Sequence, residues 1–90
     1  MAKYLISYDY HKERDYTALY ALMKHWSAAR ILESLWFADL DGTATAVRLD
    51  LQNCADADDV FVVIELMPGA DWAYTAGAQA AGGKWLENNI

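Results

Sequence analysis

Apolar and polar residues alternate along the first nine positions of the chain. Tyr4, Ile6 and Tyr8 lie on one side of this segment if it is extended. Asp9 lies on the other side, at the end of the alternation. A period of two is typical of a β-strand that buries one face. We therefore predict a strand over residues 2–9 that ends on an acidic residue.

The period changes to that of a helix after Asp15. Apolar residues then recur at spacings of three and four, at Tyr16, Leu19, Tyr20, Met23 and Trp26. The side chain of Asp15 can accept hydrogen bonds at a helix start, and Lys24 and His25 suit the negative end of a helix dipole. The pattern predicts a helix over residues 15–26.

Residues 28–42, AARILESLWFADLDG, are rich in branched and aromatic side chains and exceed the length of a typical strand. They form either one bent strand or two short strands around Ser34. Asp41 and Gly42 predict a turn after them, and Thr43 predicts the N-cap of a second helix. The apolar side of this helix is formed by Ala44, Val47, Leu51 and Cys54.

Residues 60–66, VFVVIEL, are almost continuously apolar. Such a run is typical of a central strand that is covered on both faces. Pro68 and Gly69 end it.

The remaining chain contains aromatic and small residues and ends in the amphipathic sequence KWLENNI. Gly82 and Gly83 weaken a helix through the small residues. We expect a loop and then a short helix, which packs through Trp85, Leu86 and Ile90. The chain is thus divided into a core of residues 1–66 and a C-terminal segment of residues 67–90, which packs on the core or on a dimer partner.

The predicted order is strand, helix, one or two strands, helix and strand. This order is that of a split βαβ unit, in which right-handed crossovers place two helices on one face of an antiparallel sheet. We therefore predict an α+β fold of the ferredoxin-like type, βαββαβ. The other face of the sheet needs a cover, and a second copy of the chain is the natural candidate.

Composition limits the classes of function. The chain has 90 residues, 56% of them hydrophobic, which suits one domain with a core. Its net charge of -6 argues against tight nonspecific binding to nucleic acid. No stretch approaches the roughly 20 apolar residues that cross a bilayer, and Cys54 is the only cysteine. We expect a soluble cytoplasmic protein without membrane contact, disulfide or cysteine metal site.

Three stretches resemble a known family: YLISYD, which precedes and includes Asp9; RILESLWF, residues 30–37; and DDVFVVIEL, residues 58–66. They are similar to the CRISPR-associated "Cas-two" ribonuclease-like superfamily, which includes virulence-associated protein D and SinR-like small proteins. The likeness extends over residues 3–66. It implies a homodimer of ferredoxin-like protomers, in which Asp9 binds a divalent metal at the dimer interface of members that cut RNA or DNA. The acidic balance and the C-terminal segment fit the SinR-like branch better than the adaptation proteins.

The chemistry expected of such a site begins with Asp9. Magnesium or manganese needs only one or two protein carboxylates besides waters and phosphate, and two copies of Asp9 would supply them. His11 is a candidate general base because its ordinary pKa lies near neutrality. Glu33 and Glu65 would extend an acidic strip if they share the face of Asp9. The alternative is that all these groups are solvated rim residues or are paired within the chain.

Nucleic-acid contacts near Asp9 would come from Lys12, Arg14 and Arg30, and Tyr8, Tyr10 and Trp36 could stack on bases. Aromatic residues at these spacings are more often part of a core. Trp72, Tyr74 and Trp85 are the predicted dimer contacts, since large aromatic residues favour interfaces.

Two classes of function follow. The first is a metal-dependent endonuclease that acts on RNA rather than DNA, with Asp9 and His11 as catalytic residues. The second is a non-catalytic, acidic, dimeric module that binds a protein partner. A weaker third hypothesis is an acidic mimic of nucleic acid. The chain contains no Ser-His-Asp spacing and no phosphate-binding glycine loop.

Overall fold

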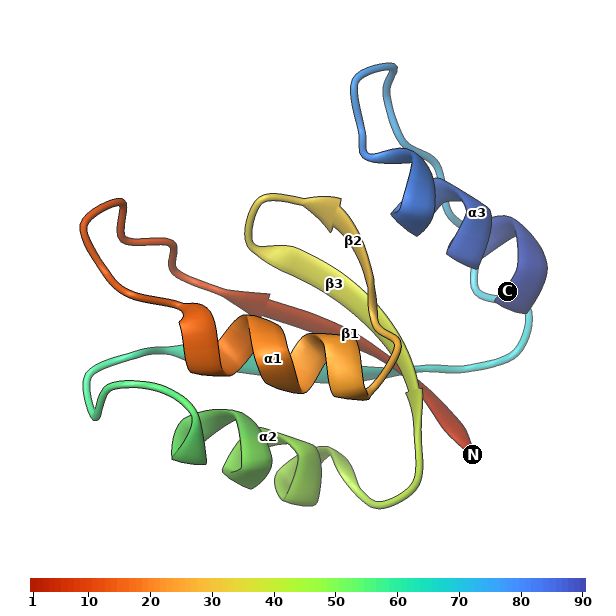
Figure 1. Cartoon of the computed structure of the whole chain (residues 1–90). Coiled ribbons are helices and arrows are strands. Elements are labelled where there is room, and N and C mark those ends of the chain that lie inside the picture. Colours follow the sequence, from red (N-terminus) through yellow and green to blue (C-terminus); the bar gives the residue numbers. More distant parts are fainter.

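Four strands form one antiparallel sheet in the computed structural model, which describes residues 1–90 (Figure 1). Along the chain the elements are β1 (Ala2–Tyr8), α1 (Thr17–His25), β2 (Ala29–Leu32), β3 (Leu35–Leu40), α2 (Ala44–Asn53), β4 (Phe61–Leu66) and α3 (Ala80–Asn89). The α+β prediction is confirmed, and the segment around Ser34 forms two short strands rather than one bent strand.

The sheet has the order β2-β3-β1-β4, and all neighbouring strands are antiparallel. This arrangement is compatible with a ferredoxin-like fold. The prediction of a central strand at residues 60–66 was wrong, because β4 lies at an edge of the sheet and Val62 and Ile64 are half-exposed. The apolar run does give β4 two apolar faces, but the chain itself covers only one of them.

Local interactions define the helix starts. The hydroxyl of Thr43 accepts a hydrogen bond from the backbone N–H of Ala46 at 3.1 Å, which confirms the predicted N-cap of α2. The predicted start of the first helix at Asp15 was wrong, because α1 begins at Thr17 with Tyr16 at the N-cap position and no side-chain cap. Asp15 instead accepts hydrogen bonds from the backbone N–H and the hydroxyl of Thr17, at 2.9 and 2.6 Å, and these bonds lower the pKa of its carboxyl group. None of the three helices is both long and apolar enough to cross a membrane.

Helices α1 and α2 lie on the same face of the sheet (Figure 1). The core between these helices and the sheet consists of Tyr4, Ile6, Tyr8, Tyr16, Leu19, Met23, Ala38, Leu40, Val47 and Leu51. The hydroxyl of Tyr4 donates a hydrogen bond to the carbonyl of Gly42 at 2.6 Å, so this buried polar group has a partner. The alternating residues predicted for β1 therefore form the centre of the main core.

The second face of the sheet is covered only in part, by α3. A smaller core forms there from Ile31, Phe37 and Leu86, and the ring of Trp85 stacks on that of Phe37 with centroids 5.0 Å apart. Gly82 allows α3 to lie this close to β2, because a Cβ at its position would lie 2.6 Å from the Cα of Ile31. The glycine that weakens the isolated helix is therefore what lets α3 approach β2.

Candidate functional site

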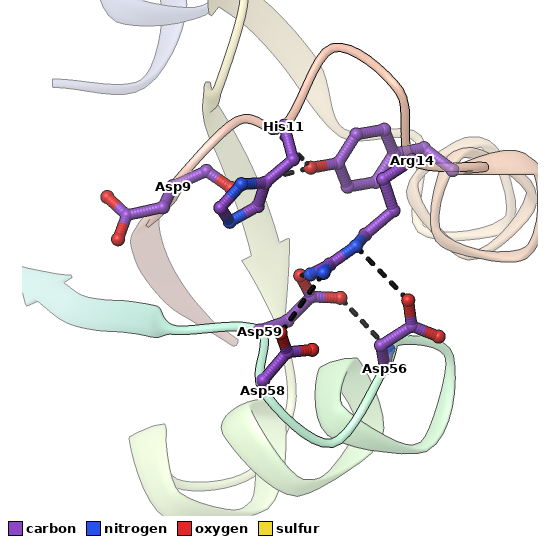
Figure 2. Close-up of polar contacts among 7 residues, drawn as sticks. Asp9, His11, Arg14, Asp56, Asp58 and Asp59 are labelled. Carbon is purple, nitrogen blue, oxygen red and sulfur yellow. Dashed lines mark hydrogen bonds and ion pairs between the residues drawn. The ribbon is translucent and has the colours of Figure 1, made fainter.

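Asp9 lies directly after β1 and continues its pairing with β4. Its backbone N–H donates a hydrogen bond to the carbonyl of Val60 at 3.4 Å. Strand alternation places its side chain with that of Ser7, on the face away from α1 and α2. The carboxylate is exposed and makes no ion pair or side-chain hydrogen bond within the chain, and it points away from the neighbouring charged cluster (Figure 2).

His11 lies two residues further along, in the loop between β1 and α1. Its backbone N–H donates to the hydroxyl of Tyr16 at 2.7 Å, and this hydroxyl donates to the carbonyl of Asp9 at 3.4 Å. Tyr16 thus fixes the loop, while the imidazole of His11 is exposed and makes no hydrogen bond to the Asp9 carboxylate. No group of three or more His, Cys, Asp and Glu side chains in this single chain is arranged to hold a metal ion.

Arg14 makes a compact ionic cluster with three aspartates of the turn between α2 and β4 (Figure 2). The guanidinium lies 3.1 Å from Asp56 and 3.2 Å from Asp58, and it donates a hydrogen bond to Asp59. The hydrogen bond to Asp59 and that to Asp58 raise the pKa of Arg14, and the guanidinium in turn lowers the pKa of Asp58. We call this group, Arg14 with Asp56, Asp58 and Asp59, the arginine clasp.

The arginine clasp joins two loops that are far apart in the sequence. Only 4% of the Asp59 side chain is exposed, and its second oxygen accepts a hydrogen bond from the backbone N–H of Asp56 at 2.9 Å. A nearly buried carboxylate needs such partners, so the clasp stabilises the turn that leads into β4. Arg14, a predicted phosphate contact, is therefore engaged within the chain.

Arg30 is also engaged within the chain. Its guanidinium lies over the rings of Tyr20 and Trp36, 4.9 and 5.0 Å from their centroids, and donates to the Tyr20 hydroxyl at 3.1 Å and to the carbonyl of Glu33. The indole of Trp36 donates to the hydroxyl of Tyr8 at 3.2 Å, and burial raises the pKa of Tyr8 to about 12. Two of the three residues proposed to stack on bases are thus part of an internal network.

Lys12 and Tyr10 remain the accessible members of the predicted nucleic-acid surface. Lys12 is exposed and makes no ion pair, and Tyr10 is 38% exposed and stacks on Tyr16 with ring centroids 5.5 Å apart. The predicted acidic strip does not form. Glu65 pairs with Tyr4 and therefore shares the face of the helices, and Glu33 lies in the turn between β2 and β3.

The predicted dimer contacts separate into two groups. Trp72 and Tyr74 stack on each other with centroids 5.9 Å apart and are 36% and 44% exposed. The Tyr74 hydroxyl packs against α3 so closely that a Cβ at Gly83 would lie 2.5 Å from it. Trp85, by contrast, packs on Phe37 of its own chain.

A groove lies between α3, the segment of residues 70–75 and the second face of the sheet. This open groove has a volume of about 710 Å³, and its lining includes Leu5 and Phe37 from the sheet and Leu86 from α3. Asp71 is the only charged residue among those that line it. The sequence reasoning missed this groove because it depends on where α3 docks, although the apolar residues of β1, β3 and β4 that face away from α1 and α2 were a signal for it.

Comparison of the chain with models of known protein families, with curated proteins and with solved structures found no significant match.

Proposed function

We propose that this chain is a non-catalytic interaction module that binds an apolar segment of a protein partner in the groove. The observation that carries this proposal is the groove itself, which is lined on one side by the sheet and is almost entirely apolar. Its volume of about 710 Å³ lies within the range of specific binding pockets, and exposed apolar patches rimmed by polar groups are typical of interaction sites.

Charge defines the chemistry of the proposed partner. Asp71 is at the groove, and the chain as a whole carries a net charge of -6. A partner segment that has apolar side chains next to Lys or Arg complements both features, since opposite charges accelerate association and exclude acidic competitors. Apolar burial supplies the free energy of binding, at about 25 cal/mol per Å² removed from water.

A selection from a displayed library of random peptides tests this proposal. We expect enrichment of peptides with two or more large apolar residues next to a basic one. Leu32 lines the groove and is 53% exposed, so Leu32→Glu adds a charge there without emptying the core. Binding should fall at least about tenfold in this variant, which corresponds to about 1.4 kcal/mol.

Leu49→Glu is the matched control, because Leu49 is 50% exposed and lies on α2, outside the groove. It should bind the selected peptides as the wild type does. Equal losses in the two variants, or no enrichment of apolar and basic peptides, would contradict the proposal.

The strand order supports a finer assignment of the fold as ferredoxin-like, and the resemblance supports a homodimer. The β2-β3-β1-β4 order, with two helices on one face, is the arrangement expected for βαββαβ connectivity. The partly covered second face gives a second copy of the chain a surface to bind. Sedimentation measured over a range of concentrations tests this assembly, and a monomer at every concentration would contradict it.

A metal-dependent endoribonuclease is the second candidate, and the unpaired carboxylate of Asp9 at the end of the central strand is the observation that favours it. In a dimer that brings them together, which differs from pairing through β4, two copies of Asp9 would hold magnesium or manganese, which would supply an activated water for attack on a phosphodiester. The test is RNA cleavage with each metal by the wild type, by Asp9→Asn and by Asp50→Asn, a control for another exposed acid. If Asp9→Asn abolishes cleavage and Asp50→Asn does not, an endoribonuclease would become the leading function in place of the interaction module.

A further inference from the structure

The two edges of the sheet differ in how far the rest of the chain covers them. At the β2 edge, the backbone N–H of Gln79 donates to the carbonyl of Ile31 at 2.9 Å, and Gly82 lies against the backbone of the same strand. The loop before α3 and α3 itself thus cover this edge. β4 forms the other edge, and no loop or helix makes a backbone hydrogen bond to this strand.

Strand alternation identifies the free backbone groups of β4. Asp9 donates to the carbonyl of Val60, and in the same register Val62 and Ile64 face Ser7 and Leu5 as hydrogen-bonded pairs. The intervening residues Phe61, Val63 and Glu65 therefore direct their N–H and C=O groups away from β1. A second strand can pair with these groups, which is the property that makes an open edge associate.

The side chains on this edge are apolar where they face away from the helices. Val60, Val62 and Ile64 are 56%, 51% and 50% exposed. These three residues carry no charge, whereas the chain has a net charge of -6. Two copies of an acidic chain repel each other over most of their surface, and the repulsion is smallest where an uncharged strip meets its own copy.

We infer that a second copy of the chain pairs with this edge, β4 against β4, in an antiparallel arrangement with its two-fold axis at Val63. The pairing is self-complementary, as a two-fold interface requires. The two sheets would join into one of eight strands, and Val62 of each copy would lie opposite Ile64 of the other on the face away from the helices. The inference deepens the proposed homodimer and rests on it.

The choice of Val63 as the centre follows from the outward backbone groups and from charge. Phe61 and Glu65 lie at equal distances from Val63, so this register pairs all three residues of β4 whose backbone groups point outward. It also places each Glu65 opposite Phe61 of the other copy. A register centred on Glu65 would place two carboxylates directly opposite each other, which destabilises an antiparallel pair.

Cysteine cross-linking tests the register. In a Cys54→Ala background, chains that carry Val62→Cys are mixed with chains that carry Ile64→Cys and a mass tag, and the mixture is oxidised. Both positions are half-exposed, so neither change empties the core. Cα atoms that face each other in a non-hydrogen-bonded antiparallel pair are about 4.5 Å apart, which a disulfide can bridge.

We expect mixed disulfide dimers to form at least about tenfold faster than dimers of either chain alone, because diagonal positions lie about 7–8 Å apart. Faster cross-linking of one chain with itself would overturn the register. Dimers in sedimentation without any of these cross-links would overturn the β4 interface and leave the homodimer standing. A monomer at all concentrations would overturn both.

A second pair of variants isolates the contribution of backbone hydrogen bonds to dimerisation. Glu65→Pro removes an outward N–H, whereas Glu65→Gln keeps it and removes only the charge. Glu65 is exposed at an edge, where proline is tolerated. The proline variant should dimerise at least about tenfold more weakly than the glutamine variant, and equal dimerisation of the two would contradict strand pairing.

Discussion

The two faces of the sheet differ in how completely the chain covers them. On the helix face, Tyr4, Ile6 and Leu51 are at most 1% exposed and α1 and α2 close the core. On the second face, α3 covers the β2 side while Val62 and Ile64 stay half-exposed. The first face accounts for the stability of the single chain, and the second provides the surfaces proposed for partners. Substitutions on the two faces should therefore separate stability from binding.

The largest effect on stability is expected from Leu51→Ala, because this side chain is fully buried and its truncation leaves a cavity. The free energy of unfolding should fall by about 2–5 kcal/mol. Ile64→Ala, at a half-exposed position of the second face, should cost less than half as much in the monomer. Urea unfolding at low protein concentration measures both, and equal losses would contradict the contrast between the faces.

An intermediate effect on the free energy of unfolding is expected from Gly82→Ala. The added Cβ meets the backbone of β2, so α3 must move away, and overpacking of this kind costs about 1–3 kcal/mol. The fluorescence of Trp85 should change as its stacking on Phe37 loosens. Ala81→Ser, at the exposed neighbouring position, is the control. An unchanged stability in Gly82→Ala would show that α3 docks in another way.

The smallest effect is expected from Asp58→Asn in the arginine clasp. Arg14 lowers the pKa of Asp58 in the folded chain below its value in the unfolded chain, so the pair stabilises the fold at neutral pH. This stabilisation is complete above the unfolded pKa of about 3.9 and is lost as the pH falls through the lower folded pKa. The wild type should be slightly more stable than the variant at pH 7, and the two should converge on acidification. Thermal unfolding between neutral and acidic pH measures the difference, and a difference that grows on acidification would contradict it.

The helix face could be predicted from sequence because the patterns that define it are local in the chain. The alternation in β1, the spacing in α1 and the Thr43 cap each depend on neighbours within a few positions. The clasp was harder to predict, because Arg14 and Asp59 meet only after β1 and β4 pair. Antiparallel pairing does bring the end of β1 beside the start of β4, so the acidic turn before residue 60 was a signal that could have located it.

The arrangement of the second face could not be predicted from such local patterns. A continuous apolar run in β4 establishes that both faces of the strand avoid water, but it is the same for a central strand and for an edge strand that binds another chain. The face of Glu65 depended on the register of β4 against β1, which composition does not encode. Predicting the groove requires knowing where α3 packs on the sheet. This position depends on the close approach of α3 to β2 at Gly82.

The most direct test of the account is a map of amide chemical shifts as a selected apolar and basic peptide is added to the ¹⁵N-labelled chain. The proposed groove predicts that the largest changes fall on residues 66–78 and on α3, with those of α1 and α2 little affected. Changes centred on α1 and α2, or an equal response in the Leu32→Glu variant, would contradict the claim that the second face of the sheet is the binding surface.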